Sequence, residues 1–182
     1  MRVSHITENA LRLSSMQESS RQMKPLDIRP ILTTTAEAYR PLLEKNGNTL
    51  TVNIADNLPP VYGSADLLIQ VMANLLSNSN VHTKNGEIGI KTEMRNENGE
   101  YVVVTVTDNG SGISPELLPH MFRRNITGAS GTGIGLSISK EIITSHNGTI
   151  QIESENGKGT SVYDKSQALS KKNSLFFKSF LY

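Results

Sequence analysis

Three short segments of the sequence carry residue types that can bind a nucleotide, and the first contains a pair of asparagines. Residues 74–78 read Asn-Leu-Leu-Ser-Asn, so Asn74 and Asn78 lie four positions apart and share one face of a predicted helix. An amide oxygen suits Mg²⁺, which needs only one or two protein ligands when phosphates and water supply the others. Asparagine disfavours helix interiors, so two of them favour a functional site, although solvation of a helix face is an equal alternative.

The second segment is a glycine-rich turn that follows a buried strand. Residues 108–112 read Asp-Asn-Gly-Ser-Gly and come directly after the apolar run 101–106. An aspartate at a strand end can accept a hydrogen bond from the amino group of adenine, and Gly110 and Gly112 would let the base approach the backbone. The same residues are ordinary turn chemistry. Taken alone, this segment indicates only a turn.

The third segment is a glycine-rich loop that leads into a helix. Residues 128–135 read Gly-Ala-Ser-Gly-Thr-Gly-Ile-Gly, and the amides at a helix N-terminus bind phosphate. The loop is not a P-loop, because Ile134 follows Gly133 where a lysine is required, and its spacing is not the dinucleotide fingerprint. A flexible linker is the alternative, but an apolar helix follows at once. The order of the three segments favours a site for Mg-ATP.

The elements that must hold these segments follow from hydrophobic periodicity and turn residues. Ser64 is a good N-cap for a helix whose apolar stripe runs from Leu67 to Leu76, and residues 96–99 predict a hairpin turn. Further helices are predicted over 1–22, around 36–43, from Ser114 and over 136–146, and strands over 26–28, 50–54, 88–90, 101–106 and 150–152. This pattern predicts an α+β fold, a two-layer α/β sandwich in which helices cover one face of a mixed β-sheet.

Composition narrows the classes of protein. The 182 residues include 18 Lys and Arg against 17 Asp and Glu, which argues against a nucleic-acid protein that works through bulk electrostatics. There is no cysteine, which excludes disulfides, thiolate chemistry and zinc held by cysteine. No apolar run reaches the length of a membrane span, so we expect a cytoplasmic segment without membrane contact, whether or not a parent protein is membrane-anchored.

Together, the motifs resemble the ATP-binding catalytic domain of sensor histidine kinases, in the superfamily shared with gyrase, the heat-shock ATPase chaperones and the MutL repair proteins. Residues 74–78 resemble the N box of that family, 108–112 the first glycine box, 121–124 the F box, 131–138 the second glycine box and 157–160 the last motif. The likeness spans roughly residues 26–162 in the correct order. It implies the Bergerat-type ATP-binding fold, with ATP and Mg²⁺ as the cofactors.

The resemblance also implies the role of each residue. Asn78 would ligate Mg²⁺, Asn74 would support the phosphates or the metal, and Asp108 would accept the adenine amino group. Arg124, in a short lid over residues 123–132, is a candidate for contacting the phosphates, and with Asn74 and Asn78 completes the implied catalytic set. The implied nucleotide contacts are Asn74, Asn78, His82, Asp108, Gly110, Gly112, Gly131, Thr132, Gly133, Gly135, Leu136 and Thr160.

One residue type favours phosphotransfer over hydrolysis. In the ATPases of the superfamily, a glutamate that activates water occupies the position of Asn74, and an amide cannot act as a general base. The resemblance therefore implies a protein-histidine kinase of a two-component system that passes the γ-phosphate to a histidine and hydrolyses ATP weakly. The alternatives are a nucleotide-binding regulatory or interaction module without transfer activity, and an anti-sigma-type serine kinase. A clamp-type ATPase fits least.

The phosphoacceptor histidine is missing from the expected context. His5 lacks the His-Glu/Asp-x-x-x-Pro pattern, and residues 1–24 look like the second helix of the dimerisation hairpin, which carries no acceptor. The implied partners are a phosphoacceptor hairpin, supplied in trans or by a longer parent protein, and the receiver domain of a response regulator. A homodimer is one state that the sequence leaves open.

Three further departures from the family pattern concern the lid, the phosphates and the C-terminal end. Val81 stands where the N box usually supplies a lysine, and Asn125 replaces an aromatic residue of the F box. After Tyr163 the expected apolar final strand is missing, and a tail rich in phenylalanine follows. The predicted division is a helix over 1–24, the catalytic domain over 25–163 and an atypical tail over 164–182.

Overall fold

The computed structural model describes residues 23–96, 99–124 and 133–169 of the chain. In chain order the elements are β1 (Lys24–Leu26), α2 (Ile28–Lys45), β2 (Thr49–Asn53), β3 (Val61–Gly63), α3 (Ala65–His82), β4 (Glu87–Asn96), β5 (Glu100–Asp108), η1 (Leu118–His120), α4 (Gly135–Ser145), β6 (Thr149–Glu155) and β7 (Gly159–Gln167). The larger sheet has the order β2-β4-β5-β7-β6, and β1 pairs with β3 in a small second sheet.

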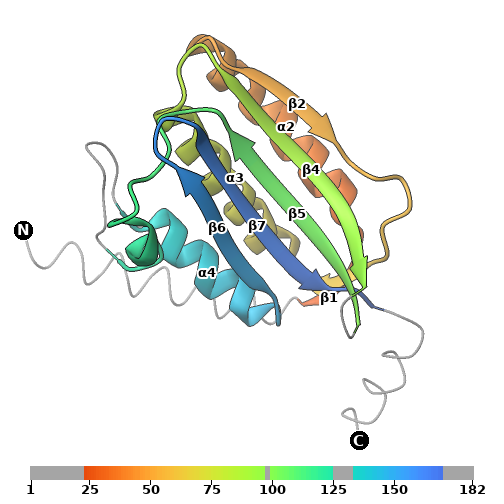
Figure 1. Cartoon of the computed structure of the whole chain (residues 1–182). Coiled ribbons are helices and arrows are strands. Elements are labelled where there is room, and N and C mark those ends of the chain that lie inside the picture. The colour runs from red at the N-terminus through yellow and green to blue at the C-terminus, as the bar shows by residue number, and fades with distance from the viewer. Residues whose placement is uncertain (1–22, 97–98, 125–132, 170–182) are drawn as a thin grey trace, which may run out of the picture.

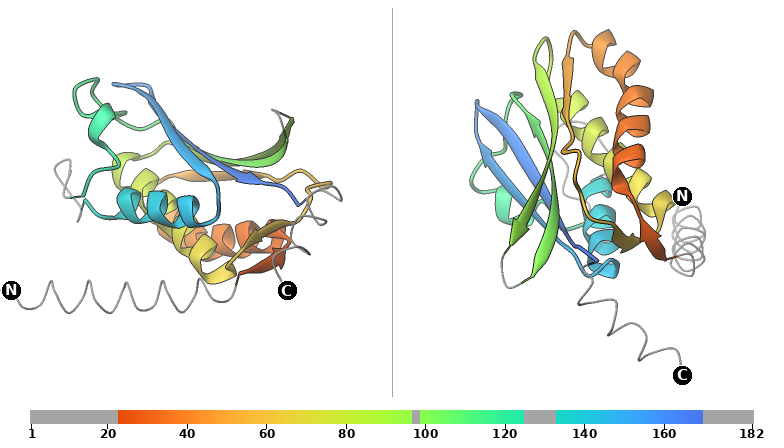
Figure 2. Two further views of the ribbon diagram at one scale, coloured as in Figure 1. Left: turned by 90° about the horizontal axis from the view of Figure 1, so that it is seen from below. Right: turned by 90° about the vertical axis from the view of Figure 1, so that its right-hand side faces the viewer.

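The larger sheet is mixed, and one of its faces is covered by helices. Strand β2 runs parallel to β4, whereas β4–β5, β5–β7 and β6–β7 are antiparallel. Helices α2, α3 and α4 lie together on one side of this sheet (Figures 1 and 2). The core between the layers contains Leu75 and Leu76 from α3, Ile142 and Ile143 from α4, and Val104 from β5. The predicted two-layer α+β sandwich is confirmed.

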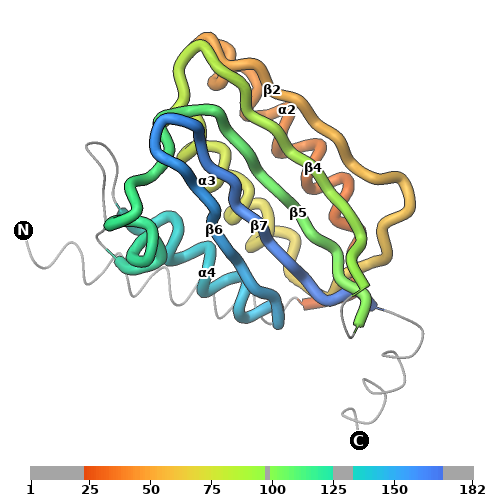
Figure 3. Tube along the Cα trace, viewed as in Figure 1, coloured from red at the N-terminus to blue at the C-terminus, as the bar shows by residue number. Residues whose placement is uncertain are grey.

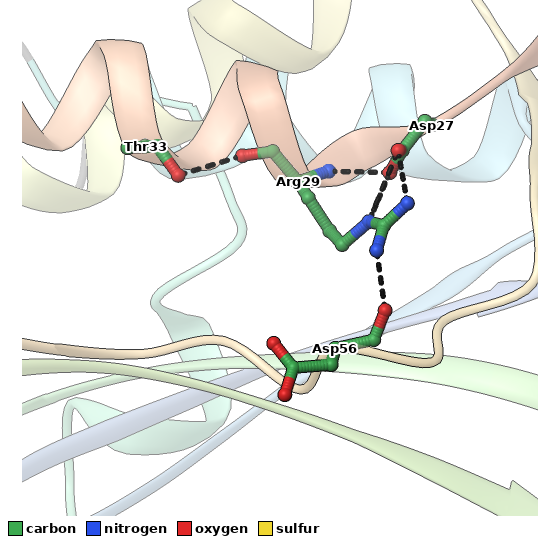
Figure 4. A network of polar contacts seen from close by, with 4 residues as sticks. All are labelled: Asp27, Arg29, Thr33 and Asp56. Carbon is green, nitrogen blue, oxygen red and sulfur yellow. Dashed lines mark hydrogen bonds and ion pairs between the residues drawn. The ribbon is translucent and has the colours of Figure 1, made fainter.

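The predicted strand over residues 26–28 is wrong in its second half, because α2 begins there. Strand β1 ends at Leu26, and Asp27 is the N-cap of α2 with a side chain that accepts a hydrogen bond from the Arg29 amide at 3.0 Å. The Arg29 guanidinium also pairs with the Asp27 carboxylate and donates to the Asp56 carbonyl (Figure 4). Pro30 lies in the first helical turn, where a missing amide hydrogen removes no helical hydrogen bond.

The final strand is present, so its predicted absence after Tyr163 is also wrong. Strand β7 continues through Asp164 to Gln167 and lies between β5 and β6 (Figure 3). Beyond it, Ala168 bridges to Val61 and the Leu169 amide donates to the Pro60 carbonyl at 2.8 Å. A strand with a partner on each side is held by backbone hydrogen bonds, which do not require apolar side chains.

Two other predictions have different outcomes. The residues after Ser114 form a turn and the short 3₁₀ helix η1 instead of an α-helix. The hairpin between β4 and β5 is confirmed, since Asn96 pairs with Glu100, although residues 97–98 lie outside the described part. The predicted helix over 1–22 lies wholly outside the described residues.

Candidate functional site

Helix α3 connects the predicted site residues to one another. Asn74 lies in its middle, Asn78 follows one turn later, and Ser79 and His82 lie towards its C-terminal end. The loop after β5 contacts that end, because the Ser111 amide donates to the His82 carbonyl at 3.1 Å. The structure therefore brings the asparagine segment and the Asp-x-Gly-x-Gly segment together, as predicted from their order.

Asp108 lies at the end of β5 with both carboxylate oxygens engaged. The Gly110 amide donates to Oδ1 at 3.1 Å, and the Ser79 hydroxyl of α3 donates to Oδ2 at 3.1 Å. An ionised carboxylate has about four acceptor positions, so two directions remain for a ligand. Asp108 itself is partly exposed. Ser79 was missed in the sequence, where a serine inside a helix carries no signal of a cross-element contact.

The glycines of this loop are required by the packing of the chain itself. A Cβ atom on Gly110 would lie 2.3 Å from the His82 carbonyl oxygen, and one on Gly112, which has φ +65°, would lie 2.1 Å from the Glu155 carbonyl oxygen. Gly159 has the same constraint, at 2.0 Å from the Asp108 carbonyl oxygen. The predicted reason for Gly110 and Gly112 was the approach of a base. The close backbone contacts are a second reason why these positions require glycine, and they show that Gly159 is required as well.

Thr160 lies beside Asp108 in the sheet and is held by a serine. Asp108 and Thr160 are register partners across β5 and β7. The Ser154 hydroxyl lies 3.0 Å from the Thr160 hydroxyl, donates to the Gly159 carbonyl at 2.8 Å and accepts from the Ile113 amide at 2.9 Å. Ser154 therefore ties the β6–β7 turn to the loop that follows Asp108.

The two asparagines differ in what they contact. The Asn74 amide nitrogen donates to the Gly135 carbonyl at 3.2 Å and to the Ser139 hydroxyl at 3.3 Å, which joins α3 to the first turn of α4. Its Oδ1 is left as an acceptor. The Asn78 side chain is partly exposed and forms no hydrogen bond with another described residue. Two amide oxygens on one helix face fit the preference of Mg²⁺ for oxygen ligands.

The other predicted residues are placed as follows. His82 is exposed on the last turn of α3, and Leu136 packs against the core. Gly133 has φ +64° just before α4. Gly131 and Thr132, most of the predicted lid and Asn125 lie outside the described residues.

Arg124 contacts α4. Its guanidinium pairs with Glu141 at 2.7 Å, and on the same helix the Lys140 ammonium lies 5.2 Å from the centre of the Phe122 ring. These residues border an open hollow of about 570 Å³, lined by Phe122, Arg124, Ser137, Lys140, Glu141, Thr144 and Ser145. Of the predicted site residues that the structure describes, only Arg124 lines this hollow, so the hollow is separate from the surroundings of Asp108.

Two searches of the described residues bear on metals and membranes. Within residues 23–96, 99–124 and 133–169, no three His, Cys, Asp or Glu side chains gather where they could hold a metal ion. No helix in those ranges combines the length and apolar character needed to cross a bilayer.

The sequence of this chain is similar to a family of ATPases. Residues 63–165 match the family described as "Histidine kinase-, DNA gyrase B-, and HSP90-like ATPase". The chain is 40% identical over 114 residues to the sensor histidine kinase TrcS of Mycobacterium tuberculosis, covering 56% of this chain and 22% of that protein. It is 34% identical over 178 residues to Drug sensory protein A of Synechocystis sp., covering 89% of this chain and 27% of that protein.

A third relative and the solved structures extend the likeness. The chain is 34% identical over 143 residues to the adaptive-response sensory kinase SasA of Thermosynechococcus vestitus, covering 75% of this chain and 37% of that protein. It thus spans 22% to 37% of the length of these relatives. The catalytic domain of histidine kinase ThkA superposes with a TM-score of 0.71 at 23% identity, over 80% of this chain and 95% of that domain. Full-length ShkA, solved in complex with AMPPNP, superposes with a TM-score of 0.73 at 23% identity, over 81% of this chain and 32% of ShkA.

Proposed function

The chain belongs to the family of histidine kinase-, DNA gyrase B- and HSP90-like ATPases, and from this premise we propose that it contains the ATP-binding catalytic domain of a sensor histidine kinase. The reaction is transfer of the γ-phosphate of ATP to a histidine on a helical hairpin. The names of the relatives, which are sensor kinases, support this reaction. The proposed domain begins near residue 25 and includes all of β7. Residues 1–24 resemble the second hairpin helix.

The observation that carries the proposal is the position of Asp108 relative to α3. Its carboxylate lies at a strand end, is held by donors from Gly110 and Ser79, and has acceptor positions to spare. The amides of Asn74 and Asn78 follow the same helix towards the start of α4. An adenine at Asp108 would thus have its phosphates directed along α3 towards Asn78 and the N-terminus of α4, where amides and the helix dipole favour anions.

Each residue has a defined task in this arrangement. Asp108 accepts the adenine amino group, and Thr160 closes the same side of the base. Asn78 supplies a metal ligand through its amide oxygen, and Asn74 holds the N-terminus of α4 against α3. Mg²⁺, if held by Asn78 and the phosphates, would supply positive charge that offsets the charge of the phosphates. Arg124 is the proposed contact to the phosphates, and it would have to leave Glu141, its partner at 2.7 Å, to make that contact.

Weak hydrolysis follows from the residue at position 74. Asn74 is an amide whose nitrogen already donates to Gly135 and Ser139, and it has no group that removes a proton from water. The γ-phosphate is therefore kept for a protein acceptor. The partners we propose are a phosphoacceptor hairpin and, downstream, the receiver domain of a response regulator, with dimer formation through the hairpin and a cytoplasmic location.

A nucleotide-binding regulatory module without transfer activity is the second candidate. Val81, next to the exposed end of α3, is apolar and 45% exposed where the resembled family usually has a lysine near the phosphates. Because the chain lacks this lysine, a domain that binds ATP without transferring its γ-phosphate is a coherent alternative. The two candidates agree on ATP binding and differ only in the transfer step.

Calorimetric titration of ATP tests the shared part, with and without Mg²⁺. Asp108→Asn should weaken ATP binding at least tenfold, because hydrogen bonds to charged groups contribute about 1.5–3 kcal/mol. Asp66→Asn is the matched control, since Asp66 is exposed in the first turn of α3. Unchanged affinity in Asp108→Asn would remove this residue from the adenine site.

Transfer is tested with γ-labelled ATP and a phosphoacceptor hairpin from a sensor histidine kinase supplied in trans. Label on the hairpin that is lost with Asn78→Ala supports the kinase. Firm ATP binding together with failure to label any such hairpin would favour the regulatory module. Fast ATP hydrolysis by the chain alone would contradict the role given to Asn74.

A further inference from the structure

Ser79 makes a contact that differs from those of other hydroxyls in the helices. Within helices, serine and threonine commonly bond back to the carbonyl three or four residues earlier. Ser137, Ser139 and Ser145 of α4 do this at 2.7–2.9 Å, and Thr33 of α2 does it at 2.9 Å. Ser79 instead donates across the layers to Oδ2 of Asp108 at 3.1 Å. Its hydroxyl therefore connects α3 to the end of β5.

The contact is buried and acts on one specific group. Ser79 is only 6% exposed, so water does not readily replace its hydroxyl at the carboxylate. The other oxygen of the same carboxylate accepts the Gly110 amide. One donor alone leaves a carboxylate free to rotate about its last side-chain bond, since that torsion has a broad energy profile. Two donors on different oxygens, one from the helix and one from the loop, hold the plane of the Asp108 carboxylate.

The neighbour of Ser79 makes this contact more than a link between two layers. Asn78 precedes it in α3, and its side-chain amide forms no hydrogen bond with another described residue. Asn78 and Ser79, which are consecutive in α3, therefore lie near opposite ends of the proposed ATP. The Ser79 hydroxyl lies at the end of the base, and the Asn78 amide lies at the end of the phosphates. A rigid helix keeps these two groups at a constant separation.

We propose that Ser79 is a positioning residue for recognition of the base. Its hydroxyl holds the Asp108 carboxylate so that a free acceptor direction meets the exocyclic amino group of a 6-aminopurine. Ser79 acts through Asp108 and makes no contact with the nucleotide itself. This inference rests on the proposed function, because it assigns the reading of adenine to Asp108.

The competing explanation is that the Ser79–Asp108 bond only fastens α3 to the sheet. The two explanations differ in nucleotide dependence. A positioning residue affects a ligand that donates to Asp108, and not one that lacks that donor. ATP and inosine triphosphate provide this pair, since the latter has an oxygen at purine position 6 where ATP has an amino group. A purely structural bond would affect both ligands equally.

The experiment is a double-mutant cycle by calorimetry on the full chain. The variants are Ser79→Ala, Asp108→Asn and the double variant, each titrated with Mg-ATP and with Mg-inosine triphosphate. Ser79→Ala should weaken ATP binding roughly three- to tenfold, as expected for loss of a hydrogen bond to a charged group, and leave inosine triphosphate unchanged. In the Asp108→Asn background, Ser79→Ala should have no further effect on ATP.

Other outcomes overturn the inference in distinguishable ways. Equal weakening of both nucleotides, or full additivity with Asp108→Asn, would make Ser79 a structural fastener only. Equal ATP affinity in wild type and Ser79→Ala would remove its role while leaving the proposed function intact. No ATP binding by a folded wild-type chain would overturn both. Ser79→Cys, similar in size with a weaker donor, should give intermediate ATP affinity, and this variant serves as the test if the alanine variant does not fold.

Discussion

Two aspartates on adjacent strands differ in their exposure to solvent and in their hydrogen bonds. Asp108 ends β5 and Asp164 lies within β7, and both belong to the set of alternating residues that face the helical layer. Asp108 is partly exposed and receives donors on both oxygens. Asp164 is 6% exposed and accepts one hydrogen bond, from the Ser166 hydroxyl at 3.3 Å. The difference is one of position, since one carboxylate lies at the sheet end and the other under the layer of helices.

Burial makes the second carboxylate costly. Desolvation raises the pKa of Asp164 from 3.8 to about 7, against the lowering effect of the Ser166 hydrogen bond. Its register partners are Val104 on β5 and Ile150 on β6, both buried and apolar. The same residue type is therefore a proposed ligand acceptor at one place and a buried, destabilising group at the other. Whether a carboxylate is stable in its charged form depends on neighbouring hydrogen-bond donors and on exposure, and not on residue type alone.

The largest expected effect comes from removing the buried charge. The pKa of Asp164 is higher in the folded state than in the unfolded state, so its stabilising contribution is complete below about pH 4 and is lost as pH rises to 7. The free energy of unfolding should fall by about 4 kcal/mol over this window. Asp164→Asn should abolish that loss, as measured by urea unfolding at pH 4 and pH 8.

Asp66→Asn, an exposed substitution, is the control for the Asp164 experiment. It should keep the pH dependence of the wild type. If Asp164→Asn unfolds with the same pH dependence as the wild type, Asp164 is not the group that makes the two regions differ.

The second effect tests how tightly the loop after β5, which contains Gly112, packs against the rest of the chain. Gly112→Ala places a Cβ at φ +65° and 2.1 Å from the Glu155 carbonyl oxygen, so strain and clash together should cost about 3 kcal/mol of stability. Gly157→Ala is the matched control. It also has positive φ, +79°, but a Cβ there meets nothing within 4 Å, so it should cost about 1 kcal/mol. Equal costs in thermal unfolding would mean that the loop moves to accept the new atom.

The third effect concerns His146, which is also a buried titratable group away from the proposed site. Its Nε2 accepts the Ser64 amide at 3.0 Å, and its Nδ1 lies 2.8 Å from the Ile142 carbonyl. Burial lowers the pKa of His146 despite these two hydrogen bonds. Its contribution to stability is thus complete above the unfolded pKa near 6.5 and is lost as pH falls below it, opposite in sign to Asp164.

His146→Phe keeps an aromatic ring, although a larger one, and leaves the Ser64 amide without its acceptor. This substitution should cost about 2 kcal/mol at pH 7.5 and remove the acid-side loss of stability. Histidine titration followed by NMR checks the direction of the pKa shift. A pKa at or above 6.5 for His146 would contradict it.

The smallest effect on stability is expected from substitution of Arg124, near the start of the proposed lid. Arg124 and Glu141 are both more than one-third exposed, so Arg124→Ala should change the free energy of unfolding by less than about 0.5 kcal/mol. Lys158→Ala, which breaks another exposed pair at 2.6 Å, is the control. Loss of ATP affinity in Arg124→Ala alone would support its proposed contact with phosphate, and equal affinity in the two variants would remove that role.

Hydrophobic periodicity and turn residues predicted most helices and strands, but they did not predict which elements contact one another. The stripe from Leu67 to Leu76 predicted α3, and residues 96–99 predicted the hairpin between β4 and β5. The strand over 26–28 was wrong because Asp27 caps a helix. Asp164 was taken as the start of a tail because the apolar final strand of the resembled family is missing after Tyr163, whereas β7 continues through Asp164 between β5 and β6.

By itself, the sequence determined the mixed two-layer fold, most of its helices and strands and the segments proposed to form the site, because periodicity and turn chemistry act over a few residues. Tertiary structure alone decided that Ser79 meets Asp108 across 29 positions, that Ser64 meets His146 across 82, and that Asp164 is buried. Such contacts depend on strand register and on the packing of helices against the sheet. They arise between elements that carry no local trace of one another.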